Sequence, residues 1–554
     1  MRRCFSLQTR LRLVSTRSPA AFFSSFDLSG FDTSQFETKN ERVPLQSKYE
    51  YDLAVVGGGS GGLAAAKEAA NCGARVILFD YVEPSTQGNS WGVGGTCINV
   101  GCVPKKLMHH AAICGELFQD ARKFGWELSP SSNAKPAFHW AELVETVVNH
   151  VRSLSFSSSS ALSKAGVKYV NAYAAFESPH TLRYDSRNDS FLSEAGKSTV
   201  SAANILVATG TRPIVPTDVE GAIEHSITSD DIFWDKKVPG KTLCVGSGYI
   251  SLETAGILNS LGFDTTVAMR SNEILRSFDS DCAAKVFDLM NDVGIRFFRE
   301  KIPKRIDKGA NGTLHVTFEG EEEAEEYDTV LYAIGREACT SGLELHRAGV
   351  GTTENGKIVC DDKDRTNVPH IYAVGDVVES RPELTPVAVQ CGRYLSRRLF
   401  NGSTETMDYD GLKVPTAVFT PFEYGCVGES EDTAETVYGK DNVDCFLWSW
   451  KSLELEASNR LKHESIDEGS YEPISPNCFA KLICLKSEGN RIVGFHFVGP
   501  NAGEVLQGFS LALNLGATKS DFDKMSKSPF GSIHFHSINR LTNIFTFFLT
   551  HSLL

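Results

Sequence analysis

A glycine-rich turn between a strand-like run and a helical run constrains the fold of this chain more than any other feature. The apolar run 51–56 leads into the sequence GGGSGG, and an alanine-rich stretch at 63–70 follows. This order predicts a Rossmann-like unit, because the glycines permit a tight turn, let the backbone approach a pyrophosphate and let the helix pack closely. A second strand, 74–79, ends in Asp80, where a carboxylate can bind a ribose hydroxyl. We therefore predict a dinucleotide site formed by Asp80 with Gly57, Gly59, Ser60, Gly61 and Gly62.

The same pattern recurs at residues 246–251, in the sequence GSGYIS. A strand is predicted at 241–245 and a helix at 252–261, and the next strand, 264–269, ends in Arg270 rather than in an acid. Guanidinium groups pair with a 2′-phosphate that a carboxylate would repel, so this unit should prefer NADPH to NADH. The alternative is that the arginines are solvated surface charges. The residues expected to hold this second cofactor are Gly246, Gly248, Tyr249, Ile250, Arg270 and Arg276.

Three shorter segments, each a strand-like run that ends in glycine, complete the two units. They are 205–213, 330–336 and 371–376, and they add the candidate cofactor contacts Thr209, Gly210, Gly335, Arg336, Gly375 and Asp376. The third segment returns the chain to the first unit, so the second unit is inserted within the first. From residue 411 onward, strands at 480–485 and 492–498 and a helix at 502–515 predict a separate α+β domain. We interpret the acidic run 319–326 as a solvated loop and not as a metal site.

Composition and the chain ends exclude several classes of partner. The net charge of −14 argues against nucleic acid. The 14 cysteines show no paired zinc spacing, so no metal is expected. The apolar stretch 541–554 is too short to span a bilayer, so no membrane partner is expected. Residues 1–26 carry five arginines and no acid, which is typical of an organellar transit peptide, with the mitochondrion as first choice. The alternatives are a disordered basic tail, another organelle or the cytoplasm.

Two cysteines, Cys97 and Cys102, form a close pair after the first glycine unit. Their four-residue spacer should place both sulfurs on about one helical turn. NADPH delivers electrons as hydride, whereas a disulfide accepts them by nucleophilic attack, so a flavin is needed between the two. A permanent disulfide is the alternative, and reducing compartments disfavour it. The other twelve cysteines are most simply buried thiols.

The run WGVGGTCINVGCVPKKLMH at 91–109, with both glycine units, resembles the FAD-dependent pyridine nucleotide–disulfide oxidoreductases over about residues 50–523. The tryptophan and the Leu-Met-His ending are most similar to large thioredoxin reductases. The resemblance implies FAD and NADPH as cofactors, a homodimer, and an α/β fold of two Rossmann-like domains, one for each cofactor, plus a C-terminal α+β dimerisation domain. It implies these boundaries: leader 1–48, FAD-binding domain 49–213 and 338–410, NADPH-binding domain 214–337, dimerisation domain 411–523 and a divergent tail 524–554.

The resemblance also implies roles for particular side chains. Cys102 would contact the flavin, and Cys97 would exchange with the substrate disulfide. Lys105 would pair with Glu253 beside the flavin and lower the pKa of a neighbouring thiol. Tyr249 would cover the nicotinamide pocket, and Thr96 is a further expected cofactor contact. His109 and His110 receive no role.

Two residues of the first predicted helix help to predict which disulfide the protein reduces. Glutathione reductases present two arginines to the carboxylates of glutathione. By resemblance, Lys67 and Glu68 occupy the corresponding positions in this chain. We expect Glu68 to repel glutathione, which favours thioredoxin as the disulfide substrate and a role in cell redox homeostasis. Glutathione-disulfide reductase is the alternative.

The C-terminal segment departs from the family pattern. The expected His-Pro-Thr-x-x-Glu motif is missing, and His534 is the nearest candidate for the general acid–base. No cysteine follows Cys484 to form a C-terminal redox pair. We favour a mistranslated or mis-spliced end as the explanation. The alternatives are direct substrate reduction or lost turnover, which would leave a flavin-binding dimer without disulfide chemistry. We expect this chain to bind FAD and oxidise NADPH with an artificial acceptor but to reduce thioredoxin poorly.

Overall fold

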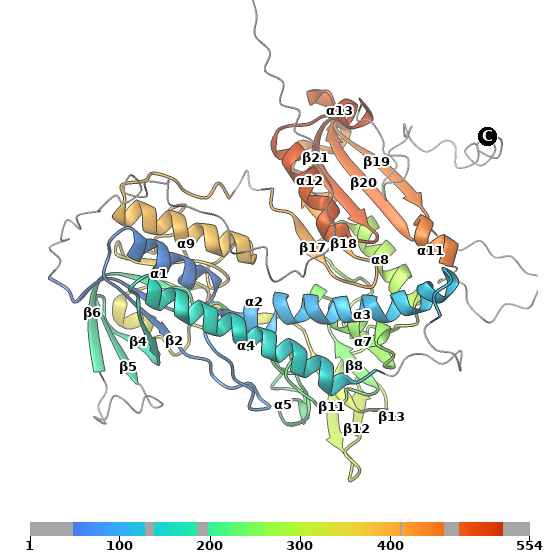
Figure 1. Ribbon diagram of the computed structural model, residues 1–554, viewed down its shortest axis with the longest axis horizontal. Coiled ribbons are helices and arrows are strands. Elements are labelled where there is room, and N and C mark those ends of the chain that lie inside the picture. The colour runs from blue at the N-terminus through green and yellow to red at the C-terminus, as the bar shows by residue number, and fades with distance from the viewer. Residues whose placement is uncertain (1–47, 128–137, 186–197, 410–412, 459–475, 525–554) are drawn as a thin grey trace, which may run out of the picture. The chain divides into compact units, whose positions relative to one another are not determined.

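The first glycine-rich turn lies at the carboxyl end of a central strand in a seven-stranded sheet of the computed structural model, which describes residues 48–127, 138–185, 198–409, 413–458 and 476–524 (Figure 1). The strand order is β3-β2-β1-β6-β5-β4, and β16 also pairs with β6. The pairs among β1, β2, β3, β6 and β16 are parallel, whereas β4, β5 and β6 pair antiparallel. The bounds are β1 Tyr51–Val56, β2 Val76–Asp80, β3 Lys168–Asn171, β4 Tyr173–Ser178, β5 Thr181–Asp185, β6 Ser198–Val207 and β16 Ile371–Ala373.

Helices α1 (Ser60–Asn71) and α9 (Thr385–Phe400) pack together against this sheet. Their closest approach uses small residues, since a Cβ at Gly392 would lie 2.5 Å from the carbonyl oxygen of Gly61. Within the turn, a Cβ at Gly62 would lie 1.9 Å from the carbonyl oxygen of Gly57. Glycine is therefore required both for the turn and for the helix packing that the sequence predicted.

A second, four-stranded parallel sheet has the order β10-β9-β8-β14 and is flanked by α7 (Tyr249–Ser260) and α8 (Ser280–Asp292). Its strands are β8 Thr242–Val245, β9 Thr265–Met269, β10 Arg296–Arg299 and β14 Thr329–Tyr332. A three-stranded antiparallel sheet of β11 (Pro303–Lys308), β12 (Leu314–Phe318) and β13 (Ala324–Tyr327) follows β10 in the chain.

The predicted acidic loop at 319–326 is wrong in its second half. Glu325 and Glu326 belong to β13, which pairs with β12. The reason is Tyr327, whose buried ring anchors the strand. Its hydroxyl donates to Glu325 Oε2 at 3.0 Å, while Glu326, on the opposite face, is exposed. A run of acids can thus form an edge strand when one apolar residue fixes its register.

The C-terminal part contains a five-stranded antiparallel sheet of order β17-β18-β21-β20-β19. Its strands are β17 Thr416–Val418, β18 Tyr424–Gly428, β19 Val443–Trp450, β20 Cys478–Leu485 and β21 Arg491–Val498. Its helices are α10 Glu431–Tyr438, α11 Leu453–Ser458, α12 Ala502–Asn514 and α13 Lys519–Lys524. Parallel Rossmann-like sheets with a C-terminal antiparallel sheet confirm the predicted α/β fold class.

Two long helices, α3 (Cys102–Lys123) and α4 (Trp140–Lys164), follow the short helix α2 (Gly95–Val100) (Figure 1). They share an apolar cluster with α7 that includes Met108, Val144 and Leu258. The remaining elements in the described part of the chain are α5 Ala222–His225, α6 Ser229–Ile232, three short 3-10 turns, and the pair β7 (Thr211–Pro213) and β15 (Arg336–Ala338). Among the described residues, no helix has both the length and the apolar character needed to cross a membrane.

Candidate active site

One cavity of about 1790 Å³ brings together most of the predicted site residues. It draws on both glycine units, on the dithiol and on the segments after β14 and β16. The predicted residues that line it are Gly57, Gly59, Ser60, Gly61, Asp80, Thr96, Cys97, Cys102, Lys105, Thr209, Gly210, Tyr249, Ile250, Glu253, Arg336, Gly375 and Asp376. Six others do not line it, namely Gly62, Gly246, Gly248, Arg270, Arg276 and Gly335. His534 lies outside the described residues.

The two cysteines lie on separate helices, which corrects the expectation of a single turn. Cys97 is in α2, and Cys102 is the first residue of α3. The helices are interrupted at Gly101, where a Cβ would lie 2.9 Å from the carbonyl oxygen of Thr96. The dithiol therefore spans a helix break, and Cys102 occupies a helix N-terminus, where the unpaired amides favour a thiolate.

The two thiols have opposite acidities. A hydrogen bond from Cys97 lowers the pKa of Cys102 to about 6. The charge of Lys105 and a hydrogen bond from Thr385 also lower this pKa, whereas burial raises it. The same sulfur–sulfur hydrogen bond, with burial, raises the pKa of Cys97 above its ordinary value. Cys102 is the more exposed of the two residues, and Cys97 is half-buried. The directions of the two shifts favour a thiolate at Cys102 and a thiol at Cys97.

Lys105 and Glu253 form the ion pair that the sequence predicted. The Lys105 Nζ lies 2.8 Å from Glu253 Oε1, and the carboxylate is almost fully buried on α7. The same oxygen accepts a hydrogen bond from the backbone N–H of Phe419 at 2.8 Å. Lys105 also stacks over the ring of Phe419, 4.7 Å from its centroid. Contacts with Glu253 of α7 and with Phe419 thus hold Lys105 of α3 in place next to the dithiol.

The first glycine turn fits the pyrophosphate and polar groups of FAD. Helix α1 begins after Gly59 with no side-chain cap and no acid in its first turn, so its free amides are available to a phosphate. A Cβ at Gly95 would lie 2.6 Å from the Cα of Gly59, so the glycine at 95 lets the start of α2 pack directly against the turn. Two buried oxygens of residues that line the cavity, Thr209 Oγ1 and Asp230 Oδ1, have no hydrogen-bond partner among the described residues. Orphaned groups of this kind are expected where a polar cofactor completes the site.

Asp80 ends β2 at the edge of the same cavity, as predicted. Its Oδ1 accepts a hydrogen bond from the backbone N–H of Gly58 at 2.8 Å. Burial raises the pKa of this carboxyl group to about 6, against the opposing effect of that hydrogen bond. A carboxylate beside the glycine turn at the end of the second strand is where a dinucleotide's ribose hydroxyl would bind.

The second glycine turn repeats this geometry next to Tyr249. Gly246 has φ +130°, and α7 begins after Gly248 without a side-chain cap or an acid in its first turn. Tyr249 is 42% exposed and lines the cavity. Arg270, directly after β9, and Arg276 are both exposed, and neither forms an ion pair with another described residue. Two unpaired guanidinium groups beside this turn fit a 2′-phosphate.

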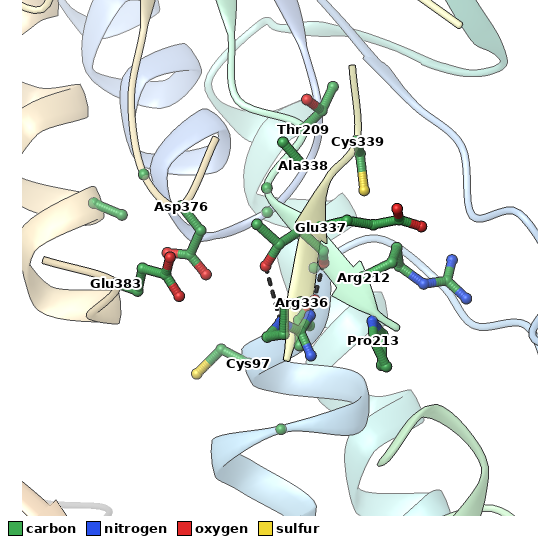
Figure 2. Close-up of a pocket in the computed structure, with 18 of the residues that line it drawn as sticks. Cys97, Thr209, Arg212, Pro213, Arg336, Glu337, Ala338, Cys339, Asp376 and Glu383 are labelled. Carbon is green, nitrogen blue, oxygen red and sulfur yellow. Dashed lines mark hydrogen bonds between the residues drawn. The ribbon is translucent and has the colours of Figure 1, made fainter. Parts of the chain in front are cut away.

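Arg336, Asp376 and Cys97 all line the cavity, and Figure 2 labels the three. Arg336 Nε donates to Thr211 Oγ1 at 2.8 Å, and one terminal nitrogen donates to the carbonyl oxygen of Thr211 at 2.7 Å. Burial, with the nearby carboxylate of Glu383, raises the pKa of Asp376. Arg336 is thus held by β7, and Asp376 is the polar group left facing the cavity.

Sequence reasoning missed two contacts of the dithiol region. Thr385, at the start of α9, hydrogen-bonds to both cysteines, although it lies far away in the chain and no motif marks it. His109, which received no role, has its Nε2 3.1 Å from Glu423 Oε1, and both side chains are buried. The spacing of Cys102, Lys105 and His109 places His109 on the face of α3 that carries the dithiol, but no local pattern marks its partner.

Glu68 is not the free negative charge that the substrate argument required. Its Oε1 lies 2.6 Å from Arg397 Nε on α9, and neither Lys67 nor Glu68 lines the cavity. The pairing cancels much of the repulsion expected toward glutathione. The choice of substrate therefore depends on other observations.

Over most of its length, the chain is similar to a known protein family and to individual curated proteins. The pyridine nucleotide-disulphide oxidoreductase family matches residues 51–392, and its dimerisation domain matches residues 414–528. A protein named thioredoxin reductase from Plasmodium falciparum (isolate 3D7) is 47% identical over 522 residues, which cover 94% of this chain and 82% of the relative. Thioredoxin reductase 2, mitochondrial, from Drosophila melanogaster is 44% identical over 476 residues, which cover 85% of this chain and 87% of the relative. With these matches and this cavity, the chain belongs to the pyridine nucleotide-disulphide oxidoreductase family, whose members use FAD and NADPH.

Proposed function

We propose that this protein is an NADPH-dependent flavoprotein disulfide reductase that acts on oxidised thioredoxin and thereby supports cell redox homeostasis. The observation that carries the proposal is the Cys97 and Cys102 pair on the wall of the cavity that the first glycine turn also lines. Relatives named thioredoxin reductase, 44–50% identical over most of the chain, support the substrate. The ion pair of Lys105 and Glu253 beside the dithiol is the arrangement such chemistry needs.

The residues around the dithiol have different roles in the proposed reaction. FAD, when bound, would couple hydride transfer from NADPH to reduction of the disulfide. Cys102, with its lowered pKa, remains a thiolate toward the cofactor, and Lys105 balances that charge. Cys97, whose protonated form is favoured, exchanges with the substrate disulfide once a base removes its proton. We propose His534 for that base.

The second glycine unit selects and seats the nicotinamide cofactor. Tyr249, half-exposed at the cavity wall, covers the nicotinamide position. Arg270 and Arg276 bind the 2′-phosphate, since no described carboxylate pairs with them. The backbone amides after Gly248 contact the pyrophosphate.

At the level of the chain, we propose an FAD-binding domain of residues 49–213 and 338–410, an NADPH-binding domain of 214–337 and an interface domain of 411–523. The match of residues 414–528 to a dimerisation domain supports a homodimer. A mitochondrial location with a leader at 1–48 is supported by the arginine-rich composition and by a relative whose name includes mitochondrial.

Steady-state kinetics with two oxidised substrates test this function. The protein, with FAD bound and NADPH saturating, is assayed with oxidised thioredoxin and with oxidised glutathione at equal disulfide concentration. We expect kcat/KM to be at least about tenfold higher for thioredoxin. The ratio remains informative even if absolute turnover is low, and a preference for glutathione would contradict the proposal.

A further inference from the structure

Lys481 is a buried charge that the proposed reaction does not use. It lies in β20 with its side chain 0% exposed. Its Nζ is 3.0 Å from Asp279 Oδ2, 2.7 Å from Asp281 Oδ2 and 2.6 Å from Glu431 Oε2. Burial disfavours the ammonium form, but hydrogen bonds to Asp281 and Glu431 and the charge of Asp279 outweigh burial and raise the pKa of Lys481. The lysine is therefore a fixed positive charge inside the protein.

The partner that matters most is Asp279, because its carboxylate caps two helices. Oδ1 accepts a hydrogen bond from the N–H of Cys282 in the first turn of α8, at 3.3 Å. Oδ2 accepts one from the N–H of Glu431, the first residue of α10, at 3.1 Å. Asp279 is only 1% exposed, and a carboxylate so buried needs a cation to remain charged. Lys481 supplies that cation from the five-stranded sheet.

Asp279 also ends the segment 270–279, which presents Arg270 and Arg276. The middle of this segment is tied to the second glycine turn, because the N–H of Leu275 donates to the carbonyl oxygen of Ser247 at 2.9 Å. Leu275 has φ +49°, in the left-handed region that non-glycine residues avoid. Such a conformation persists only where the surroundings hold it. Strand β9 fixes one end of the segment, and Asp279 fixes the other.

We propose that Lys481 is a positioning residue for NADPH selectivity: it holds Asp279 at the start of α8 and thereby fixes the segment that carries Arg270 and Arg276. This inference rests on the proposed function, because it assigns the 2′-phosphate to these arginines. It extends that function by placing a determinant of cofactor choice in the C-terminal antiparallel sheet, outside the nucleotide-binding unit.

The test is the kinetic selectivity of Lys481→Met. NADPH and NADH oxidation are measured on the FAD-loaded protein with ferricyanide as electron acceptor, which bypasses the disulfide substrate. The variant should raise KM for NADPH by about fivefold and leave kcat and the KM for NADH within about twofold, because it removes binding of the 2′-phosphate without touching the redox centre. The NADPH to NADH ratio of kcat/KM should fall accordingly.

Three variants separate positioning from a purely structural role. Glu431→Gln removes one carboxylate from Lys481 but leaves the contact with Asp279, so its ratio should match wild type. Lys481→Arg keeps the charge and should restore most of the ratio. Should Lys481→Met fail to fold, the double variant Asp279→Asn with Lys481→Met leaves no unpaired buried charge and should show the same loss of selectivity.

An unchanged NADPH to NADH ratio in folded Lys481→Met, or in the folded double variant, would overturn the inference alone, whatever the thermal stability of the variant. A wild-type protein with no preference for NADPH would overturn this inference together with the cofactor assignment of Arg270 and Arg276. The two failures are therefore distinguishable.

Discussion

At the residue scale, the chemistry of the site depends on an asymmetric pair of thiols. The hydrogen bond between the sulfurs favours a thiolate at Cys102 and a thiol at Cys97. Lys105, held by Glu253, adds a cation on the side of Cys102. Because a thiolate is the reactive form of cysteine, the charge of Lys105 is a direct control on reactivity.

The ionisation of Cys102 should therefore follow pH in a defined direction. A lowered pKa means that the thiolate is present above about pH 6 and is lost as the pH falls through that value. Lys105→Met should raise this midpoint by about one pH unit, because an opposite charge that favoured the thiolate is removed. The measurement is the pH titration of thiolate absorbance in the reduced protein, with Cys97→Ser used to assign the signal.

The matched control is the neighbouring lysine. Lys106 lies 4.0 Å from the centroid of Phe419 and pairs with Glu423 and Glu504, away from the sulfurs. Lys106→Met should leave the midpoint of Cys102 unchanged. Equal shifts in the two variants would show that a general charge effect, and not the position of Lys105, sets the pKa.

At the element scale, the first nucleotide unit depends on close packing of α1 against α9. The two helices come from segments far apart in the chain, and both support the cavity, α1 through the glycine turn and α9 through Thr385. Their contact is made at Gly61 and Gly392, where no side chain separates the backbones.

A side chain at this contact should cost stability. Gly392→Val is expected to lower the free energy of unfolding by about 1–3 kcal/mol or more, because its Cβ would lie 2.5 Å from the carbonyl oxygen of Gly61. Gly115→Ala, in α3, meets no atom within 4 Å and should be neutral or slightly stabilising. Urea unfolding of both variants checks the difference, and equal stabilities would contradict the packing argument.

The sequence predicted elements well where local pattern and tertiary packing agree. Strand β1, the glycine turns and the strand ends at Asp80 and Arg270 all follow from short-range signals. Helices α1 and α7 begin three residues earlier than predicted, because residues of the motif itself are the first helical turn. The helix break at Gly101 was missed because it depends on crowding by the carbonyl oxygen of Thr96.

The contacts that sequence could not predict are those between distant segments. The partners of Glu68, His109 and the cysteines come from α9 and from residue 423, and no local pattern encodes those meetings. The pairing of Glu68 with Arg397 shows the consequence: a charge that looks free in the sequence can be neutralised by the fold.

At the scale of the whole molecule, the cavity takes residues from two glycine units, the dithiol helices and the strand that returns at β16. Lys481 of the C-terminal sheet reaches α8, and Phe419 and Glu423, from the loop between β17 and β18, reach the dithiol helix. The assembly should be a dimer, so sedimentation equilibrium is expected to give about twice the chain mass of 60.6 kDa. A mass of one chain at micromolar concentration would contradict this.

We propose that Cys102 faces the flavin and receives its electrons. The decisive measurement is the anaerobic titration of the FAD-loaded protein with NADPH. A long-wavelength absorption band from the Cys102 thiolate beside the flavin should appear on titration of wild type, should be present in Cys97→Ser before NADPH is added, and should be absent in Cys102→Ser. No band in wild type, or a band that persists in Cys102→Ser, would show that Cys102 is not reduced through the flavin and would favour a flavin-binding dimer without disulfide turnover.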